Sequence, residues 1–226
     1  MTHRANARIA GFTFLFYIAL GIPAMVLLGR ATNGQGIAAQ LASMAQHASD
    51  VRAAVVLILL TSLCALVLGV SLYAITRDQD PDLALLALTC RVGEGVVSGI
   101  SIQRTLGLLS LATAAGADAP DTGAARALGT FLLSGQGPGA MFFAVGSLLF
   151  SWLLLRGRLI PVLLAWLGVL ASILWVVGLP LQLAGVLPDS LTWLMWLPMA
   201  AFEIPFALWL IIKGVAVPTT RRGSEP

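Results

Sequence analysis

The sequence predicts an all-α protein, a polytopic helical membrane bundle with six transmembrane helices and additional short interfacial helices. Its 226 residues are 58% hydrophobic and 10% charged, whereas soluble domains carry about 25% charged residues. The mean hydropathy is +0.93. The apolar residues gather into long runs with short links, and a helical span needs about 20 mainly apolar residues. We therefore expect one integral membrane domain over residues 1–226, with no room for a sizeable soluble domain.

Six apolar runs are predicted to cross the bilayer. They cover residues 9–29, 53–76, 83–111, 138–156, 162–185 and 193–212. The first run exceeds the h-region of a cleaved secretory signal, which has about 7–15 apolar residues, so we expect an uncleaved first span.

The segment 35–50 between the first two spans is predicted to be a helix lying in the membrane interface. Its apolar residues recur at three- and four-residue steps, which places them on one helix face. They are Ile37, Leu41, Met44, Ala48 and Val51. A surface loop with one or two helical turns is the alternative interpretation.

A second interfacial or partly inserted helix is predicted at 124–134, before a break that contains Gln136 among three glycines and a proline. Broken helices in transporters expose backbone groups that bind ions or substrates, so Gln136 is a secondary site candidate. A helix-turn-helix at the membrane surface is the simpler interpretation.

Composition argues against several classes of site. The net charge of +3 comes from basic residues near helix ends, which is typical of topology signals, so no nucleic-acid partner is expected. Cys64 and Cys90 fall within predicted spans and are interpreted as packing residues. His3 and His47 lie in the tail and the first loop, away from membrane depth. No metal and no cofactor are therefore expected.

Three ionisable residues are predicted inside the bilayer: Arg91 and Glu94 in the third span, and Glu203 in the last. A charge at the centre of a membrane helix costs about 2.5–3.5 kcal/mol, so these residues are the main site candidates. Arg91 and Glu94 are three residues apart and share a helix face. Gln103 and Arg104 are secondary candidates near the opposite interface, where an interfacial anchor is the favoured interpretation of Arg104.

The function predicted for this polar centre has three alternatives. A buried cluster of Arg91, Glu94 and Glu203 would fix helix packing or form a small polar site for a small-molecule ligand. A carboxyl that exchanges a proton beside an arginine also suits a proton-coupled transporter of a small molecule or ion. An intramembrane or lipid-modifying enzyme is the third, although no motif supplies a nucleophile or a metal site, so the sequence leans against an enzyme.

The distribution of Lys and Arg predicts the orientation in the membrane. With six spans, both termini share one side, and that side holds eight basic residues: Arg4, Arg8, Arg77, Arg156, Arg158, Lys213, Arg221 and Arg222. The other side holds three: Arg30, Arg52 and Arg126. Basic residues favour the cytoplasm, so both termini are predicted there. The lipid bilayer is the expected partner, and the oligomeric state stays open.

Short motifs along almost the whole chain resemble the DUF4386 family, a group of bacterial and archaeal multi-pass membrane proteins of unknown function. They are Ala7-Arg8-Ile9-Ala10-Gly11, Arg91-Val92-Gly93-Glu94, Arg158-Leu159-Ile160-Pro161 with Leu167-Gly168, and the ending from Glu203 to Lys213-Gly214. The resemblance implies the same fold and location in the plasma membrane of a prokaryote. It implies no activity, ligand or cofactor. The positions similar to the family pattern are Arg91, Glu94, Glu203 and Lys213.

Overall fold

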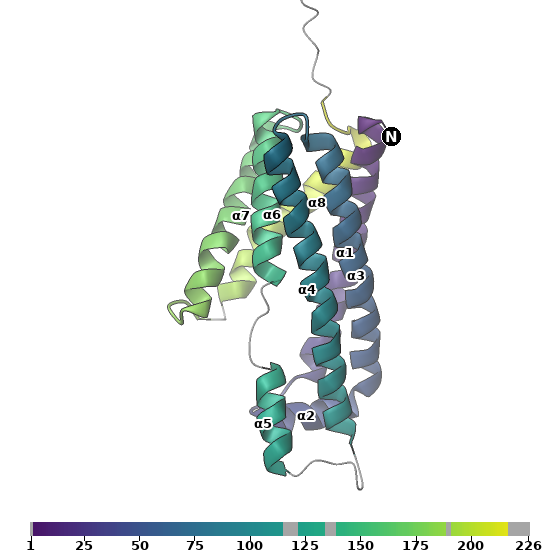
Figure 1. Ribbon diagram of the computed structural model, residues 1–226, viewed down its shortest axis with the longest axis vertical. Helices are drawn as coiled ribbons and strands as arrows, with labels where there is room; N and C mark the ends of the chain where they lie inside the picture. The colour runs from purple at the N-terminus through teal and green to yellow at the C-terminus, as the bar shows by residue number, and fades with distance from the viewer. Residues whose placement is uncertain (1, 115–121, 134–138, 189–190, 217–226) are drawn as a thin grey trace, which may run out of the picture. The chain divides into compact units, whose positions relative to one another are not determined.

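The computed structural model describes residues 2–114, 122–133, 139–188 and 191–216, which form eight α-helices (Figure 1). The helices are α1 (His3–Ala31), α2 (Ile37–Gln46), α3 (Ala48–Thr76), α4 (Pro81–Thr113), α5 (Thr122–Leu133), α6 (Gly139–Arg156), α7 (Val162–Leu183) and α8 (Leu191–Ile212). The described residues include no strand. The all-α class predicted from the sequence is therefore confirmed.

Six of these helices, α1, α3, α4, α6, α7 and α8, are long and apolar enough to cross a membrane. Each overlaps one of the six apolar runs predicted from the sequence. Several begin earlier than the apolar run does, as α1 does at His3 and α3 at Ala48. Backbone hydrogen bonding continues a helix through polar residues beyond the apolar part. The protein is a polytopic helical membrane bundle.

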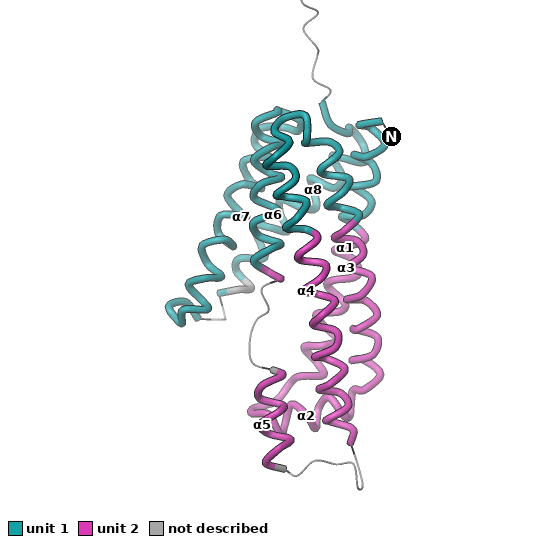
Figure 2. Tube along the Cα trace, viewed as in Figure 1, with its two compact units in different colours: residues 1–15, 67–91, 141–226 teal, residues 16–66, 92–140 magenta. Residues whose placement is uncertain are grey.

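The chain divides into two compact units (Figure 2). Unit 1 comprises residues 1–15, 67–91 and 141–226, and unit 2 comprises residues 16–66 and 92–140. The boundary between the units falls within α1, α3, α4 and α6. The organisation as one integral membrane domain stays a prediction.

In unit 1, α7 and α8 pack closely because glycines on α7 accept large side chains of α8. A Cβ at Gly168 would lie 2.6 Å from the Phe202 ring, and one at Gly178 would lie 2.5 Å from the Met195 side chain. Trp175 is fully buried between them and donates its indole N–H to the Met195 carbonyl over 2.9 Å. This bond satisfies the polar atom of a buried tryptophan.

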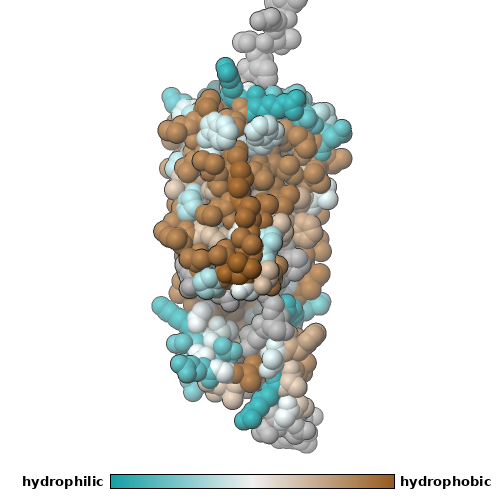
Figure 3. Space-filling model, turned by 90° about the vertical axis from the view of Figure 1, so that its left-hand side faces the viewer, coloured by the Kyte–Doolittle hydropathy of each residue, from teal (hydrophilic) through white to brown (hydrophobic). Residues whose placement is uncertain are grey.

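The opposite face of α7 carries exposed apolar side chains. They recur at helical spacing and are Leu163, Trp166, Leu170, Leu174, Val177 and Leu181. Figure 3 shows this face as a largely hydrophobic surface. A continuous apolar surface of this kind is unfavourable in water and matches the hydrocarbon of a bilayer.

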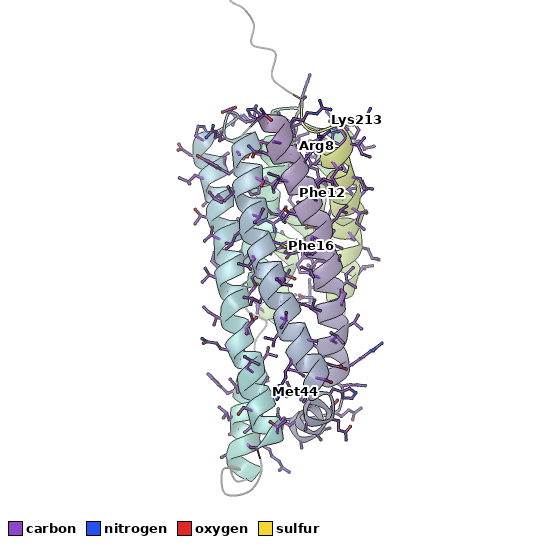
Figure 4. All side chains as sticks on the ribbon, turned by 90° about the vertical axis from the view of Figure 1, so that its right-hand side faces the viewer. Arg8, Phe12, Phe16, Met44 and Lys213 are labelled. Carbon is purple, nitrogen blue, oxygen red and sulfur yellow. The ribbon has the colours of Figure 1, made fainter. Side chains whose placement is uncertain are left out.

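One end of unit 1 gathers the polar links between helices. Asp80 accepts a hydrogen bond from Arg156 over 3.0 Å, and Asp78 lies 3.4 Å from the His3 ring. The Ala216 amide donates to the Leu159 carbonyl over 2.9 Å. Arg8 on α1 and Lys213 after α8 lie at this same end (Figure 4).

In unit 2, the short helices α2 and α5 pack against each other. Gly129 of α5 permits the approach, because a Cβ there would lie 2.9 Å from the Ile37 side chain and 3.4 Å from that of Leu41. Met44 is fully buried, and its position on α2 is labelled in Figure 4. It belongs to a core of Ala31, Met44, Val51, Leu108 and Leu109. The helix predicted at 35–50 is therefore amphipathic, although it ends at Gln46 and Ala48 already begins α3.

Candidate functional site

Arg91 is buried in unit 1 at 1% exposure. Its guanidinium donates a hydrogen bond to the Ser147 hydroxyl of α6 over 2.9 Å. The guanidinium carbon also lies 4.9 Å from the centre of the Phe143 ring and 6.0 Å from that of Phe14. Cation–π contacts of this kind contribute about 2 kcal/mol when they are shielded from water.

The approach of Arg91 to its neighbours depends on small residues around it. A Cβ at Gly69 of α3 would lie 2.9 Å from the Arg91 Cβ, and one at Gly146 of α6 would lie 3.1 Å from the Cys90 Cβ. Helices that carry glycine at their contact points pack closely in membranes. Arg91 is therefore held where α3, α4 and α6 meet.

Glu203 is also buried in unit 1, at 4% exposure. It lies on α8 between Phe202 and Phe206, whose rings stack with their centres 5.1 Å apart. The Phe206 ring also meets the Phe14 ring edge to face at 5.6 Å. Aromatic rings thus link the surroundings of Arg91 to the turn of α8 that carries Glu203.

Glu94 lies one helical turn after Arg91 on α4 and belongs to unit 2. Its side chain is 5% exposed. The Tyr17 hydroxyl of α1 donates a hydrogen bond to Glu94 Oε1 over 2.7 Å. Buried polar groups are held in place by their hydrogen-bond partners, so Tyr17 orients this carboxyl.

Glu94 and Tyr17 both line a pocket of about 580 Å³ inside unit 2. Residues of α1, α3 and α4 form its walls. They are Tyr17, Gly21, Ala24, Met25, Leu28, Gly29, Thr32, Ile58, Thr61, Ser62, Glu94 and Ser98. Glu94, Ser62 and Ala24 are buried, whereas Met25 and Gly29 are exposed, so the carboxyl lies on the closed side.

Glycines explain why this pocket exists. A Cβ at Gly95 of α4 would lie 3.2 Å from the Ser62 carbonyl and 3.1 Å from the Leu66 side chain, so α3 and α4 are in close contact there. By contrast, a Cβ at Gly21 or Gly29 of α1 would meet nothing within 4 Å. Because these two glycines have no side chain, the space beside α1 stays open.

The secondary candidates occupy different surroundings. Gln103 is exposed on α4. Arg104 donates a hydrogen bond to the Leu132 carbonyl over 2.7 Å and so joins α4 to α5. The interpretation of Arg104 as an interfacial anchor stays a prediction. Gln136 lies outside the described residues.

In the described part of the chain, metal binding would require a cluster of His, Cys, Asp or Glu side chains. No group of three or more His, Cys, Asp or Glu side chains is arranged there to hold a metal ion. Cys64 and Cys90 are free thiols.

Sequence reasoning missed Tyr17, Phe143 and Ser147. A tyrosine inside an apolar run is usually a packing residue, and no pattern in the sequence links it to a carboxyl 77 residues away. Its position, eight residues inside the first apolar run and away from the interfaces that tyrosine prefers, was the available signal. Ser147 carries no comparable signal, because serine is common at helix contacts in membranes.

Long apolar helices, buried charges and an internal pocket with one carboxyl define a class, the multi-pass helical membrane proteins with a polar interior. Residues 9–214 match the family model of DUF4386, described as a domain of unknown function, and the chain belongs to this family. The resemblance noted in the sequence is therefore confirmed. No curated protein and no solved structure matches the chain.

Proposed function

We propose that this protein binds a small molecule in the Glu94 pocket, within the plasma membrane of a prokaryote. The observation that carries the proposal is a buried carboxyl, held by Tyr17, on the wall of a pocket of about 580 Å³. Small-molecule sites have volumes of about 300–1,000 Å³ and combine apolar walls with a few oriented polar groups. The pocket has both properties.

Arg91 is assigned a packing role in this proposal. Its hydrogen bond to Ser147 and its contacts with Phe14 and Phe143 support this assignment, because all are contacts within the helix bundle. Such contacts select one arrangement of helices over others. Arg91 would thus hold the helices of unit 1 in one arrangement.

The orientation proposed for the chain has both termini in the cytoplasm. The polar end of unit 1 supports it, because six basic residues belong to the segments that meet there: Arg4, Arg8, Arg77, Arg156, Arg158 and Lys213. Cytoplasmic segments are enriched in such residues. Labelling of Arg77→Cys, in a Cys64→Ala, Cys90→Ala background, would test it. Reaction with a membrane-impermeant maleimide in intact cells would contradict it, whereas reaction only in inverted vesicles agrees.

The binding proposal is tested with a variant that fills the pocket. Gly21→Leu places a side chain in the open space beside α1, and Gly99→Leu is the matched control. A Cβ at Gly99 also meets nothing within 4 Å, and this residue does not line the pocket. Both changes replace a helical glycine with leucine, so they have similar effects on helix propensity.

The measurement is the thermal unfolding midpoint in phosphatidylcholine nanodiscs, followed by tryptophan fluorescence. Three probes of equal length are added separately: hexylamine, hexanol and hexanoate. We expect at least one probe to raise the midpoint of the wild type and of Gly99→Leu, and none to raise that of Gly21→Leu. A probe effect that is absent from the wild type, or equal in Gly21→Leu, would overturn the proposal.

Proton-coupled transport is the second candidate. It is favoured by the position of Glu94, since a buried carboxyl on a pocket wall is a group that can carry a proton with a substrate. Proteoliposomes with an imposed pH gradient would be supplied with the probe that binds. Accumulation that requires both the gradient and Glu94 would support transport, whereas binding without accumulation would leave a receptor or accessory role.

A further inference from the structure

Three hydroxyl groups on the pocket wall donate to carbonyls of their own helices. Thr32 donates to the Leu28 carbonyl, Thr61 to that of Leu57, and Ser62 to that of Ile58, each over 2.8 Å. A hydroxyl has one proton and two lone pairs. These three side chains therefore offer a ligand their oxygen lone pairs.

The acidic group of the pocket is an acceptor as well. Glu94 accepts a hydrogen bond from the Tyr17 hydroxyl, and the hydroxyl oxygens of Thr61 and Ser62 belong to the same wall. Among the described residues that line the pocket, none is Lys, Arg or His. Four polar side chains of the lining, those of Glu94, Thr32, Thr61 and Ser62, thus offer acceptor oxygens, and Ser98 adds one further hydroxyl. A carboxyl among acceptor oxygens is the complement of a hydrogen-bond donor with positive charge.

The remaining wall is apolar. Ala24, Met25 and Leu28 of α1 and Ile58 of α3 provide hydrocarbon contact along the pocket. The lining of α1 extends from Tyr17 to Thr32, a rise of about 22 Å at 1.5 Å per residue. A ligand that fills this space needs an apolar part that extends away from its polar group.

We propose that the ligand of this pocket is an amphiphilic ammonium compound, a primary or secondary amine in its protonated form. This inference rests on the binding function proposed above. The ammonium group donates to Glu94 and to the hydroxyl oxygens on the closed side. The alkyl part lies along Ala24, Met25 and Leu28. A bare metal ion does not fit the described lining, which has a single carboxyl and a volume far greater than one ion.

Two sources supply this chemistry: a soluble amine, or the headgroup of an aminolipid. Met25 and Gly29 are exposed and lie on the open side of the pocket. In a membrane, the surroundings of the protein include lipid, so a lipid headgroup is one source of the ligand. The two sources share the recognition of an ammonium by Glu94. They are separated by comparing hexylamine in phosphatidylcholine nanodiscs with nanodiscs that contain phosphatidylethanolamine and no added probe.

The first test compares affinities of hexylamine, hexanol and hexanoate for the wild type and for Glu94→Gln. We expect hexylamine to bind the wild type at least about tenfold more tightly than hexanol, since charge-assisted hydrogen bonds are about twice as strong as neutral ones. Glu94→Gln is expected to remove this preference while it changes the hexanol affinity by less than about threefold. Hexanoate is expected to bind most weakly.

The lipid arm uses the unfolding midpoint. A rise on replacing phosphatidylcholine with phosphatidylethanolamine, seen in the wild type and absent from Glu94→Gln and Gly21→Leu, assigns the ammonium to a lipid. A hexylamine effect without a lipid effect assigns it to a soluble amine. The absence of both effects overturns the inference.

The two proposals fail differently. If hexanol binds as tightly as hexylamine and Gly21→Leu abolishes both, the pocket binds small molecules but not through charge, so only the present inference falls. If no probe distinguishes the wild type from Gly21→Leu, the binding function itself falls.

A second variant keeps the test valid if Glu94→Gln does not fold. Thr61→Val removes one acceptor oxygen from the wall and nearly preserves side-chain shape, and Thr89→Val is its control. Thr89 also donates to a carbonyl of its own helix, 2.9 Å away, but it does not line the pocket. We expect Thr61→Val to weaken hexylamine more than hexanol and Thr89→Val to affect neither; equal losses for both probes would contradict the inference.

Discussion

The Tyr17 hydroxyl lies 2.7 Å from Glu94 Oε1, so the middle of α1 is tied to the middle of α4 within unit 2. This bond orients a buried carboxyl on the wall of a pocket. It also accounts for a polar aromatic residue in a run that is otherwise apolar.

Removal of the Tyr17 hydroxyl is expected to destabilise the protein. Tyr17→Phe deletes the donor to a buried acceptor, a change that costs about 1–3 kcal/mol. Tyr73→Phe is the control, because the described residues provide no hydrogen-bond partner for the Tyr73 hydroxyl. The measurement is thermal unfolding in detergent, and equal midpoints for the two variants would show that the bond contributes nothing.

Arg91→Lys tests whether the shape of the guanidinium matters as well as its charge. Lysine lacks the planar group that donates to Ser147 and lies over the Phe143 ring, so we expect a loss of about 1–3 kcal/mol. The same substitution at Arg77, which is exposed, should have little effect. Unfolding of both variants in the same detergent gives the comparison, and equal stability of Arg91→Lys and wild type would refute the packing role.

Two glycines of α1 are expected to respond differently to alanine. A Cβ at Gly11 would lie 2.7 Å from the Ala207 carbonyl oxygen, whereas one at Gly21 would meet nothing. Gly11→Ala should therefore destabilise the protein by about 1–3 kcal/mol through overpacking. Gly21→Ala should leave stability unchanged or raise it by up to about 1 kcal/mol, because alanine favours helix. The measurement is the melting temperature of each variant. A melting temperature of Gly11→Ala equal to or above that of Gly21→Ala would contradict the prediction.

Asp80 has two partners, and they are separable by mutation. It accepts a hydrogen bond from the Leu83 amide over 3.2 Å, directly before α4 begins at Pro81, and it pairs with Arg156. Asp80→Ala should cost about 0.5–2 kcal/mol through the lost helix cap. Arg156→Gln removes only a surface ion pair, which contributes about 0–1 kcal/mol. A larger loss from Arg156→Gln than from Asp80→Ala would be the contrary result.

The fold class follows from the sequence because hydrocarbon thickness sets a minimum length for each apolar run. Runs of that length predict helices irrespective of their partners. The short motifs within them carry the resemblance to DUF4386, which the match of residues 9–214 to the family model confirms. Burial of Arg91, Glu94 and Glu203 could be predicted for the same reason. Their functional roles stay predictions.

The pocket could not be predicted, because it depends on distances between helices. Gly21, Gly29 and Gly95 are alike in sequence, yet Gly95 permits a close contact and the other two leave open space. Helix packing depends on which faces meet, and hydropathy carries no information about that in a chain apolar on all sides. The partnership of Tyr17 with Glu94 is hidden for the same reason.

The open space at Gly21 and Gly29 also bears on how relatives of this chain diverge. Each position accepts added carbon atoms without displacing a neighbour, so single substitutions there would shorten or narrow the chamber in steps of one methyl or more while the backbone stays in place. The size of the side chain at these two positions would thus set the length of ligand that the pocket accepts. Family members that keep the carboxyl and differ at these two sites would select ligands of different lengths with the same headgroup.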